Sequence, residues 1–583
     1  TAHVSGSDTA QGPRGVELQE GSAHPVAPPS YSASVGEAPP PGRMEPALQE
    51  TGRQQWGSKV EFILACVGNA VGLGNLWRFP YLCYSSGGGA FLIPYFIMLV
   101  FCGIPLLYME YATGQFTRQG PVGALQKICP FLQGAGMGTV VLSFLFVTYY
   151  NVIMTWAFYY LFSCFQARLP WSHCNNTFNT PLCWDGDDMN GTRVKPNDSV
   201  SPSQEFFERR VLEQSAGIEY QGTLKWDLCL ILLLTWVLVY LCLWKGIRWT
   251  GKVVYFTATF PYLVIVVLLV RGLTLPGADN GVFYFVNPRW ELLKDPKVWV
   301  NAAAQNFNSI GIAFGSMIAF SSYNKRNNRI FKDVMPVTLI NSGTSLLAGF
   351  TIFSILGHIA LVQNKKVENV ATEGPGLVFQ VYPEAFNRMP AAHFFAILFF
   401  FMLILLAIDS QFASVEVVIT TIEDQFGKKL YRYLYRREFL VLIVCCVCFV
   451  LGLPNVTNGG IYYFQIIDKY SSGLSLMLIA FFEVAAIAWF YGGKTLADNV
   501  EAMTGTRPFL YFVICWYVVS PLLIAGICIF NYVQYTPVTY GKYKYPPWAD
   551  GLGWGLAGLS LICIPIGMVK GVWQAPAQPS SRN

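Results

Sequence analysis

The segment Cys66–Pro80 reads Cys-Val-Gly-Asn-Ala-Val-Gly-Leu-Gly-Asn-Leu-Trp-Arg-Phe-Pro and interrupts a hydrophobic run of membrane-spanning length. Lipid offers no hydrogen bonds to a backbone that has left the helix. An interrupted helix therefore survives at membrane depth only where it lines a cavity or an ion site inside the protein. The break frees carbonyl groups for a cation and amide groups for an anion, as it does in secondary transporters. The segment predicts a broken helix at a transport site.

A glycine-rich face for close helix packing is the alternative explanation of this segment. Packing requires only small residues, and it does not account for Asn69, Asn75 and Arg78 in the same stretch. The polar residues therefore favour a broken helix over a packing face.

The composition is that of a membrane protein. Hydrophobic residues make up 53% of the chain and charged residues 13%, where soluble domains have roughly 25% charged residues. The net charge of +5 comes from scattered basic residues and gives no indication of nucleic-acid binding. Apolar runs of roughly 20 residues, the length that crosses a bilayer, occur about twelve times. They lie near 60–83, 88–112, 136–163, 227–244, 251–271, 299–323, 334–361, 394–423, 438–453, 464–490, 509–532 and 551–572.

Basic residues orient these predicted spans, because cytoplasmic loops are enriched in Lys and Arg. The loops after the second, fourth, sixth, eighth and tenth spans carry most of them, so both termini are predicted to be cytoplasmic. Residues 1–55 have no apolar span and no signal-peptide core, and we expect a disordered tail there. Residues 56–573 would form the transporter domain and 574–583 a second tail. Pro28–Tyr31 fits the pattern of a WW-domain ligand, although a pattern this short occurs by chance in a Pro-rich tail.

The longest loop, 165–226, falls on the extracellular side in this orientation. Glycosylation requires such a lumenal surface. Three Asn-x-Ser/Thr sequons lie in the loop, at Asn175, Asn190 and Asn197. Cys174 and Cys183 are nine residues apart in the same loop and could form a disulfide in the oxidising exterior. The loop therefore supports the predicted orientation.

Catalytic chemistry has little support in the sequence. The five histidines are scattered and no HExxH motif occurs, so we expect no enzyme. A channel and a non-transporting sensor remain alternatives, because a broken helix can also line a pore.

Asp409 and Ser410 lie inside another apolar run. A buried carboxylate in lipid is unfavourable unless it is paired or bound to a cation. Oxygen ligands from carbonyls, hydroxyls, amides and carboxylates suit a hard cation such as Na⁺. The residue is therefore a candidate cation ligand, with a structural, hydrogen-bonded aspartate as the alternative.

Several ordered motifs connect the chain to a known family: Gly72–Tyr81, Gly87–Tyr95, Ser322–Lys325, Gly349–Gly357 and Phe401–Phe412. Through them the chain resembles the sodium- and chloride-dependent neurotransmitter and amino-acid transporters, the neurotransmitter:sodium symporters, along nearly its whole length. The resemblance implies an all-α membrane protein of twelve transmembrane helices. It also implies two five-helix inverted repeats, spans one to five and six to ten, with helices one and six unwound at mid-membrane.

The resemblance also implies ion sites and gates. One sodium site would use the carbonyls of Gly68, Val71 and Leu406 and the side chains of Asp409 and Ser410. A second sodium site would use Ala70, Asn75, Ser309, Asn341 and the carboxylate of the substrate. Chloride would bind Tyr95, Gln305, Ser309, Asn341 and Ser345. Charge pairs would gate the two mouths, Arg78 with Asp468 outside and Arg53 with Asp424 inside.

Gly72 indicates the substrate class. Monoamine transporters of this family carry an aspartate here, whereas glycine leaves room for a substrate carboxylate, which would meet the amides near Leu73 and Gly74 and the hydroxyl of Tyr150. The rest of the pocket would be formed by Asn69, Phe146, Asn308, Gly311, Phe314 and Ser410. Most mammalian relatives have aromatic residues at the positions of Asn69 and Asn308, so a wetter pocket and a polar or larger substrate are implied.

The resemblance as a whole implies a multi-pass plasma-membrane symporter. It would couple inward Na⁺ and Cl⁻ gradients to uptake of a zwitterionic amino acid by alternating access. Glycine or a set of neutral amino acids is the first expectation, and a substrate like GABA, taurine or betaine is the second.

Overall fold

The computed structural model describes residues 53–185, 199–363, 366–369, 377–387, 389–434, 436–541 and 543–574. All of them belong to one unit, which begins at Gly52. Several predicted features lie outside the described residues. They are most of the first tail, the Pro28–Tyr31 motif, the sequons at Asn190 and Asn197, and nearly all of the second tail.

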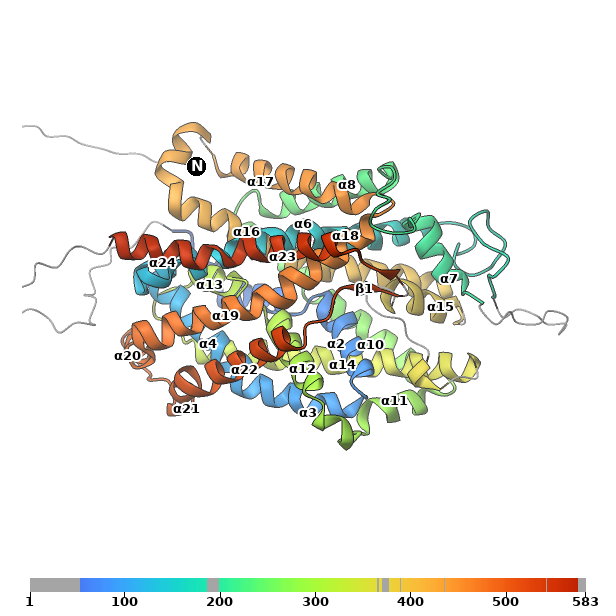
Figure 1. Ribbon diagram of the computed structural model, residues 1–583, viewed down its shortest axis with the longest axis horizontal. Coiled ribbons are helices and arrows are strands. Elements are labelled where there is room, and N and C mark those ends of the chain that lie inside the picture. The colour runs from blue at the N-terminus through green and yellow to red at the C-terminus, as the bar shows by residue number, and fades with distance from the viewer. Residues whose placement is uncertain are drawn as a thin grey trace, which may run out of the picture. The chain divides into compact units, whose positions relative to one another are not determined.

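Long apolar helices form most of the described chain (Figure 1). By length and composition, ten of the described helices can cross a membrane. They are Gly89–Thr117, Pro130–Ser163, Trp226–Leu243, Ile247–Leu273, Phe331–Gln363, Ala392–Gly427, Arg437–Val456, Gly460–Thr504, Leu510–Val533 and Pro547–Gln574. A bent pair, Lys59–Ala70 and Gly74–Ser85, makes an eleventh if it is counted as one span, with an angle of 45° between its halves. The protein is therefore a mostly helical, multi-pass membrane protein.

The predicted span 299–323 differs from the others. It is divided between α12 (Pro296–Ile310) and α13 (Ser316–Ser321), and neither helix alone is long enough to cross a membrane. Three residues between or beside these helices, Gly311, Ala313 and Gly315, have left-handed backbone conformations with φ of 79°, 62° and 74°. A right-handed helix cannot continue through such residues. The described helices thus amount to ten or eleven spans, and the twelfth stays a prediction.

The helices of the first half are α1 (Lys59–Ala70), α2 (Phe79–Ser85), α3 (Gly89–Met98), α4 (Ile104–Thr117), α5 (Pro121–Ile128), α6 (Gln133–Ser163), α7 (Pro202–Glu205), α8 (Trp226–Leu243), α9 (Ile247–Thr257), α10 (Phe260–Leu273) and α11 (Ala278–Val286). Those after α13 are α14 (Phe331–Gln363), α15 (Tyr382–Asn387), α16 (Ala392–Leu434), α17 (Arg437–Gly452), α18 (Gly460–Ile467), α19 (Leu476–Ala485), α20 (Gly493–Thr504), α21 (Leu510–Ile514), α22 (Ser520–Val533), α23 (Pro547–Leu561) and α24 (Cys563–Gln574). Short π-helical or 3₁₀ turns join several of them. The strands β1 (Thr539–Tyr540) and β2 (Tyr543–Lys544) pair as a small antiparallel hairpin.

Local sequence explains where the two interrupted helices begin. The Ser58 hydroxyl accepts a hydrogen bond from the backbone amide of Glu61 and caps α1, as Ser commonly does at helix starts. Asp295 caps α12 in the same way, and Pro296 occupies the first helical position, where its missing N–H is not needed.

Packing brings several helices together around the interruptions. Helices α6 and α16 lie side by side (Figure 1) and make the most extensive helix contact of the described chain. Helix α1 packs against α9, α14 and α16. Glu110 on α4 supports the second interruption, because its Oε1 atom accepts a hydrogen bond of 2.7 Å from the backbone amide of Ala313. The break in α1 and the break between α12 and α13 therefore lie inside the bundle.

The long loop contains the predicted disulfide. Cys174 and Cys183 are bonded, which confirms the pairing. Asn175, the sequon residue within the described part of the loop, is exposed.

Candidate substrate and ion site

A cavity of about 90 Å³ lies where the break in α1 meets α6, α12 and α16. Nine of the predicted substrate-pocket residues line it: Asn69, Gly72, Gly74, Phe146, Tyr150, Asn308, Gly311, Phe314 and Ser410. Leu73 does not line the cavity, but its backbone amide donates to the Tyr150 hydroxyl over 3.4 Å. The lining also contains Trp77, Tyr149, Ile153 and Ser414, which the sequence analysis did not identify.

Gly72 lies directly against two of the other pocket side chains. A Cβ atom at this position would be 2.5 Å from Ser410 Oγ and 3.3 Å from the Tyr150 hydroxyl oxygen. Any larger residue must therefore displace α16 or α6 side chains. The same close approach leaves the Leu73 amide and the Tyr150 hydroxyl together at the break, a pair of groups able to bind a carboxylate.

An aromatic wall forms another side of the cavity. Phe146 stacks on Tyr150 with ring centroids 4.6 Å apart, and Phe314 meets Phe146 edge-on at 5.3 Å. The Ser143 hydroxyl donates to the Phe314 carbonyl over 2.6 Å and holds that residue in place. Offset and edge-on ring pairs stabilise such walls beyond simple burial, so Phe146 and Phe314 contribute to packing as well as to the pocket.

Asn69 and Asn308 are the two polar residues predicted to make the pocket wetter. The Asn69 Nδ2 atom donates to Ser316 Oγ over 3.1 Å, which links α1 to α13. Gly311 lies close to the same amide group, because a Cβ atom at position 311 would lie 2.9 Å from Asn69 Nδ2. The Asn308 Nδ2 atom donates to the Ala304 carbonyl of its own helix over 2.9 Å. Both side chains add polar groups to the pocket.

Asp409 is buried, with 4% of its surface exposed. Its Oδ1 atom accepts a hydrogen bond of 2.5 Å from the Thr257 hydroxyl of α9, while Oδ2 has no hydrogen-bond partner among the described residues. A Cβ atom at Gly68 would lie 2.7 Å from that Oδ2 atom, so the carboxylate faces the last turn of α1. A buried carboxylate oxygen without a partner is strongly unfavourable. The arrangement fits a cation held between α1 and α16.

A second buried polar cluster joins the π-helical turn Gly74–Arg78, which follows the break in α1, to α12 and α14. Ser309 Oγ donates to Asn75 Oδ1 over 2.8 Å or to Asn341 Oδ1 over 2.9 Å, and Asn75 Nδ2 donates to Asn341 Oδ1 over 2.6 Å. The three side chains are at most 4% exposed. None of them carries a charge, and their oxygens suit a sodium ion.

The predicted chloride ligands lie beside this cluster. Asn341 Nδ2 is buried without a hydrogen-bond partner in the described chain, so it is a donor available to an anion. Ser345 Oγ donates to the Asn341 carbonyl over 3.2 Å and Gln305 Nε2 to the Gly74 carbonyl over 3.2 Å. The Tyr95 hydroxyl contacts Ser342 at 3.5 Å, a neighbour that the sequence analysis did not name. The group offers uncharged donors, which fits a monovalent anion.

The residues of the two predicted gate pairs lie at the substrate cavity and at the predicted cytoplasmic end. Arg78 and Asp468 both line the substrate cavity, and Asp468 Oδ1 accepts a hydrogen bond of 2.9 Å from the Tyr149 hydroxyl. At the other end, Arg53 Nη1 lies 2.8 Å from Asp424 Oδ1. Asp424 Oδ2 also accepts the Gly120 amide over 2.7 Å. A charge pair is thus present at the end that is predicted to be cytoplasmic.

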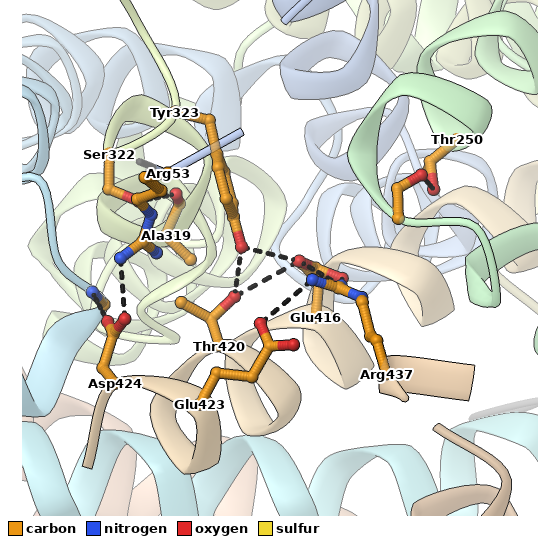
Figure 2. A network of polar contacts seen from close by, with 12 residues as sticks. Arg53, Thr250, Ala319, Ser322, Tyr323, Glu416, Thr420, Glu423, Asp424 and Arg437 are labelled. Carbon is orange, nitrogen blue, oxygen red and sulfur yellow. Dashed lines mark hydrogen bonds and ion pairs between the residues drawn. The ribbon is translucent and has the colours of Figure 1, made fainter. Parts of the chain in front are cut away.

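A polar network extends the Arg53 contact (Figure 2). The Arg53 guanidinium lies 4.5 Å from the Tyr323 ring centre, and the Tyr323 hydroxyl donates to Glu416 over 2.8 Å. Arg437 Nη2 binds both Glu416 oxygens at 2.8 and 2.7 Å, and its Nη1 binds Glu423 at 3.0 Å. Sequence analysis missed Glu416 and Arg437, although Glu416, like Asp409, is a carboxylate within an apolar run.

Comparison with known proteins identifies the family of the chain. The model of the sodium:neurotransmitter symporter family matches residues 53–575. The sodium- and chloride-dependent GABA transporter ine of Drosophila melanogaster is 49% identical over 523 residues, 89% of this chain and 56% of that protein. The sodium- and chloride-dependent taurine transporter of Rattus norvegicus is also 49% identical, over 89% of this chain and 84% of the relative. The rat sodium- and chloride-dependent GABA transporter 2 is 45% identical over 92% of this chain and 90% of its own length.

The chain therefore spans little more than half of the Drosophila relative and most of the rat relatives. Family and relatives are transporters and not enzymes, as the scattered histidines indicated. The chain belongs to the sodium:neurotransmitter symporter family.

Proposed function

We propose that this protein is a plasma-membrane symporter that couples inward Na⁺ and Cl⁻ gradients to uptake of a small zwitterion with an amine and an acid group. Its relatives are named sodium- and chloride-dependent GABA and taurine transporters. The observation that carries the proposal is the cavity at the α1 break, where the Leu73 amide and Tyr150 hydroxyl lie beside a glycine rather than a fixed carboxylate.

The preferred substrates are amino acids of the GABA or taurine type, in which the amine is separated from the acid group. The acid group binds the Leu73 amide and Tyr150, and Asn69 supports the amine end, because its Nδ2 atom is held by Ser316 and its Oδ1 atom is the remaining acceptor. Glycine and neutral α-amino acids are the second candidate, supported by the small size of the cavity, about 90 Å³.

Two sodium ions and one chloride ion accompany the substrate. The first Na⁺ binds the carbonyls of Gly68, Val71 and Leu406 with Asp409 and Ser410, which gives the unpartnered Asp409 oxygen a cation. The second binds Ala70, Asn75, Ser309 and Asn341. Chloride binds Tyr95, Gln305, Ser309, Asn341 and Ser345, where the unpartnered Asn341 amide supports anion binding.

Transport proceeds by alternating access in a fold of twelve spans with both termini in the cytoplasm. The Arg53–Asp424 pair closes the inner side, and Arg78 and Asp468, which both line the cavity, form the outer gate. Substrate and ions then favour closure of the outer pair and release of the inner one. Such ion pairs can form and break during the transport cycle, because a partly solvated ion pair adds only modest net stability.

Uptake measurements test the proposal. Proteoliposomes with imposed Na⁺ and Cl⁻ gradients are given labelled GABA, taurine, betaine or glycine, and unlabelled compounds compete. We expect saturable accumulation that needs both gradients and prefers GABA or taurine. Flux that is linear in concentration would indicate a channel, binding without accumulation a sensor, and preference for glycine the second candidate.

A further inference from the structure

The α22–α23 connection, residues 534–546, is attached to the segment that carries Asp468, a residue of the predicted outer gate. Asp468 begins the π-helical turn Asp468–Ser475, which directly follows α18. The connection contains the hairpin β1–β2, and this hairpin lies beside α18 (Figure 1). In the proposed orientation, on which this inference rests, the connection is extracellular, as the outer gate is.

Tyrosine hydroxyls attach the hairpin side of the connection to two neighbouring segments. The Tyr545 hydroxyl donates to the Tyr462 carbonyl of α18 over 3.2 Å, and this hydrogen bond is buried. The Tyr543 hydroxyl donates to Glu219 Oε2 over 2.7 Å and accepts the Ile218 amide over 3.2 Å. Both of these partners belong to the long loop, so the connection joins α18 to that loop.

Ring packing reinforces this attachment. The Tyr462 ring contacts three rings of the connection, with centroids 5.8 Å from Tyr540, 4.8 Å from Tyr543 and 5.9 Å from Tyr545. Tilted and edge-on aromatic pairs of this kind add stability beyond the burial of their surface. The Tyr462 hydroxyl also donates to the Ser215 carbonyl over 2.9 Å. Helix α18 is therefore held by a cluster of four tyrosines.

The two residues directly after Asp468 are attached as well. Lys469 Nζ donates to the Thr536 carbonyl of the connection over 2.5 Å. The Tyr470 hydroxyl donates to Asp550 Oδ1 at the start of α23 over 3.0 Å. The attachment therefore extends along the chain from α18 past the gate carboxylate.

Close packing limits movement of this segment. Tyr470 is fully buried, and its hydroxyl also hydrogen-bonds the Tyr535 hydroxyl. A Cβ atom at Gly553 of α23 would lie 2.2 Å from the Tyr470 ring. On the bundle side, the Tyr149 hydroxyl of α6 donates to Asp468 Oδ1 over 2.9 Å. Asp468 is thus held from the bundle through its own side chain and from the α22–α23 connection through its neighbours.

We propose that the α22–α23 connection is a fixed support for the outer gate, with Tyr470, Tyr543 and Tyr545 as positioning residues for Asp468. None of the three tyrosines lines the substrate cavity, so they act through Asp468 and not on the substrate. Arg78, in the turn after the break in α1, then closes against a carboxylate whose position is set.

The support acts on the equilibrium between open and closed outer gates. A hydrogen bond between charged groups is strong only when its distance and orientation are right. A carboxylate that can shift therefore stabilises the closed gate less, and the population moves toward the open gate. A role of the tyrosines in folding the extracellular loops alone would instead give effects that do not depend on Asp468.

Access to the cavity from outside measures the support. Ile153 lines the substrate cavity and is not one of the predicted binding residues. Ile153→Cys is expressed in intact cells, in Na⁺ medium without substrate, and an impermeant thiol reagent is added outside. The unmodified chain gives the background rate. Tyr543→Phe/Tyr545→Phe removes three hydrogen bonds and keeps both rings, so modification of the cysteine should be about three- to ten-fold faster.

Tyr540→Phe is the matched control. Tyr540 belongs to the same hairpin, and its hydroxyl makes no hydrogen bond to the residues that the structure describes, although its ring packs on Tyr462. We expect the rate of Ile153→Cys to be unchanged by this substitution. An equal acceleration by Tyr540→Phe would overturn the proposed role of the Tyr543 and Tyr545 hydrogen bonds.

A double-mutant cycle tests whether the support acts through the gate carboxylate. Asp468→Asn should itself accelerate modification, and Tyr543→Phe/Tyr545→Phe should add no further acceleration in that background, because residues that act through one contact are not additive. The same fold-acceleration in both backgrounds would show that the tyrosines only fold the extracellular loops, and would overturn the proposal.

Tyr470→Phe tests the support from its other end, and it serves also if the hairpin variant does not reach the cell surface. It removes the hydrogen bonds to Asp550 and Tyr535 and should give a similar, Asp468-dependent acceleration. Unchanged modification in Tyr470→Phe would overturn the proposal. The thiol assay needs no uptake, so a protein that does not transport can still show the support, and absence of the support leaves the symport proposal intact.

Discussion

At the scale of single residues, the position of Gly72 is the strongest constraint on the substrate. A Cβ atom there would lie 2.5 Å from Ser410 Oγ. A carboxylate introduced at this point would also repel the acid group of the substrate in a partly desolvated site, by several kcal/mol at short range. We therefore expect Gly72→Asp to abolish uptake and Gly72→Ala to reduce it.

Cell-surface labelling and radiolabelled uptake measure this effect. Gly74→Ala serves as the matched control, because a Cβ at Gly74 meets no atom within 4 Å. Uptake by Gly72→Asp at a level close to that of the Gly74→Ala control would remove the basis for a carboxylate or sulfonate substrate.

Asp409 carries the second prediction at this scale. Among the described residues its Oδ2 atom is buried without a hydrogen-bond partner, so we expect removal of the carboxylate to remove a cation ligand. Asp409→Ala should abolish uptake or raise the Na⁺ concentration for half-maximal uptake by about ten-fold or more. Thr257→Val removes only the hydrogen bond to Oδ1 and should shift that concentration by a few-fold, as expected for about 1 kcal/mol.

The measurement is uptake as a function of Na⁺ at constant ionic strength. If Asp409→Ala keeps the Na⁺ dependence of the unmodified protein, the carboxylate is a structural, hydrogen-bonded group and not a sodium ligand.

At the scale of elements, the Arg53–Asp424 pair connects the segment before α1 to α16. Its side chains are only 11% and 14% exposed. A partly buried hydrogen bond between charged groups contributes about 1.5 to 3 kcal/mol, so Arg53→Ala should shift the population toward the inward-open form by roughly ten-fold or more. We expect lower uptake and faster modification of Ser322→Cys, a buried position beside the network, by an impermeant thiol reagent from the cytoplasmic side.

Arg507 provides the control for this prediction. It pairs with Asp498 at 2.7 Å, but the side chains are 57% and 62% exposed, and exposed pairs contribute little. Arg507→Ala should leave uptake and thiol reactivity unchanged. Equal effects of the two substitutions would mean that the Arg53 pair does not control access.

At the scale of the whole molecule, charge balance couples the ion sites. The polar residues predicted to bind the second Na⁺ and the chloride are all uncharged, whereas Asp409 supplies one negative charge. A zwitterionic substrate adds no net charge, so two Na⁺ ions exceed the fixed negative charge and a bound Cl⁻ offsets the excess. Replacement of chloride by gluconate should therefore abolish most uptake.

Ser309→Glu should relax the need for chloride, because a fixed carboxylate beside Asn75 and Asn341 would replace the anion. Ser309→Gln, which has similar size and no charge, should stay chloride-dependent. Undiminished uptake by the unmodified protein in gluconate would contradict this charge-balance argument.

The sequence by itself determined which segments cross the membrane, because apolar length is a local property. Eleven of the predicted spans coincide with described helices or with the bent pair, and the disulfide between Cys174 and Cys183 also followed from local context. The predicted span 299–323 does not coincide with a single helix. Its polar residues and the left-handed Gly311, Ala313 and Gly315 divide it into two short helices.

Tertiary structure alone decided which polar groups meet. Thr257 and Asp409 are 152 residues apart, and Lys59 joins Asp333 across an even longer separation. Glu416 and Arg437 come from adjacent helices, α16 and α17, yet nothing in their spacing indicates that Arg437 would bind two carboxylates and connect to Tyr323. The length of an apolar segment follows from the residues of that segment alone. The pairing of buried charges depends instead on how distant helices pack, and that packing is a property of the folded chain.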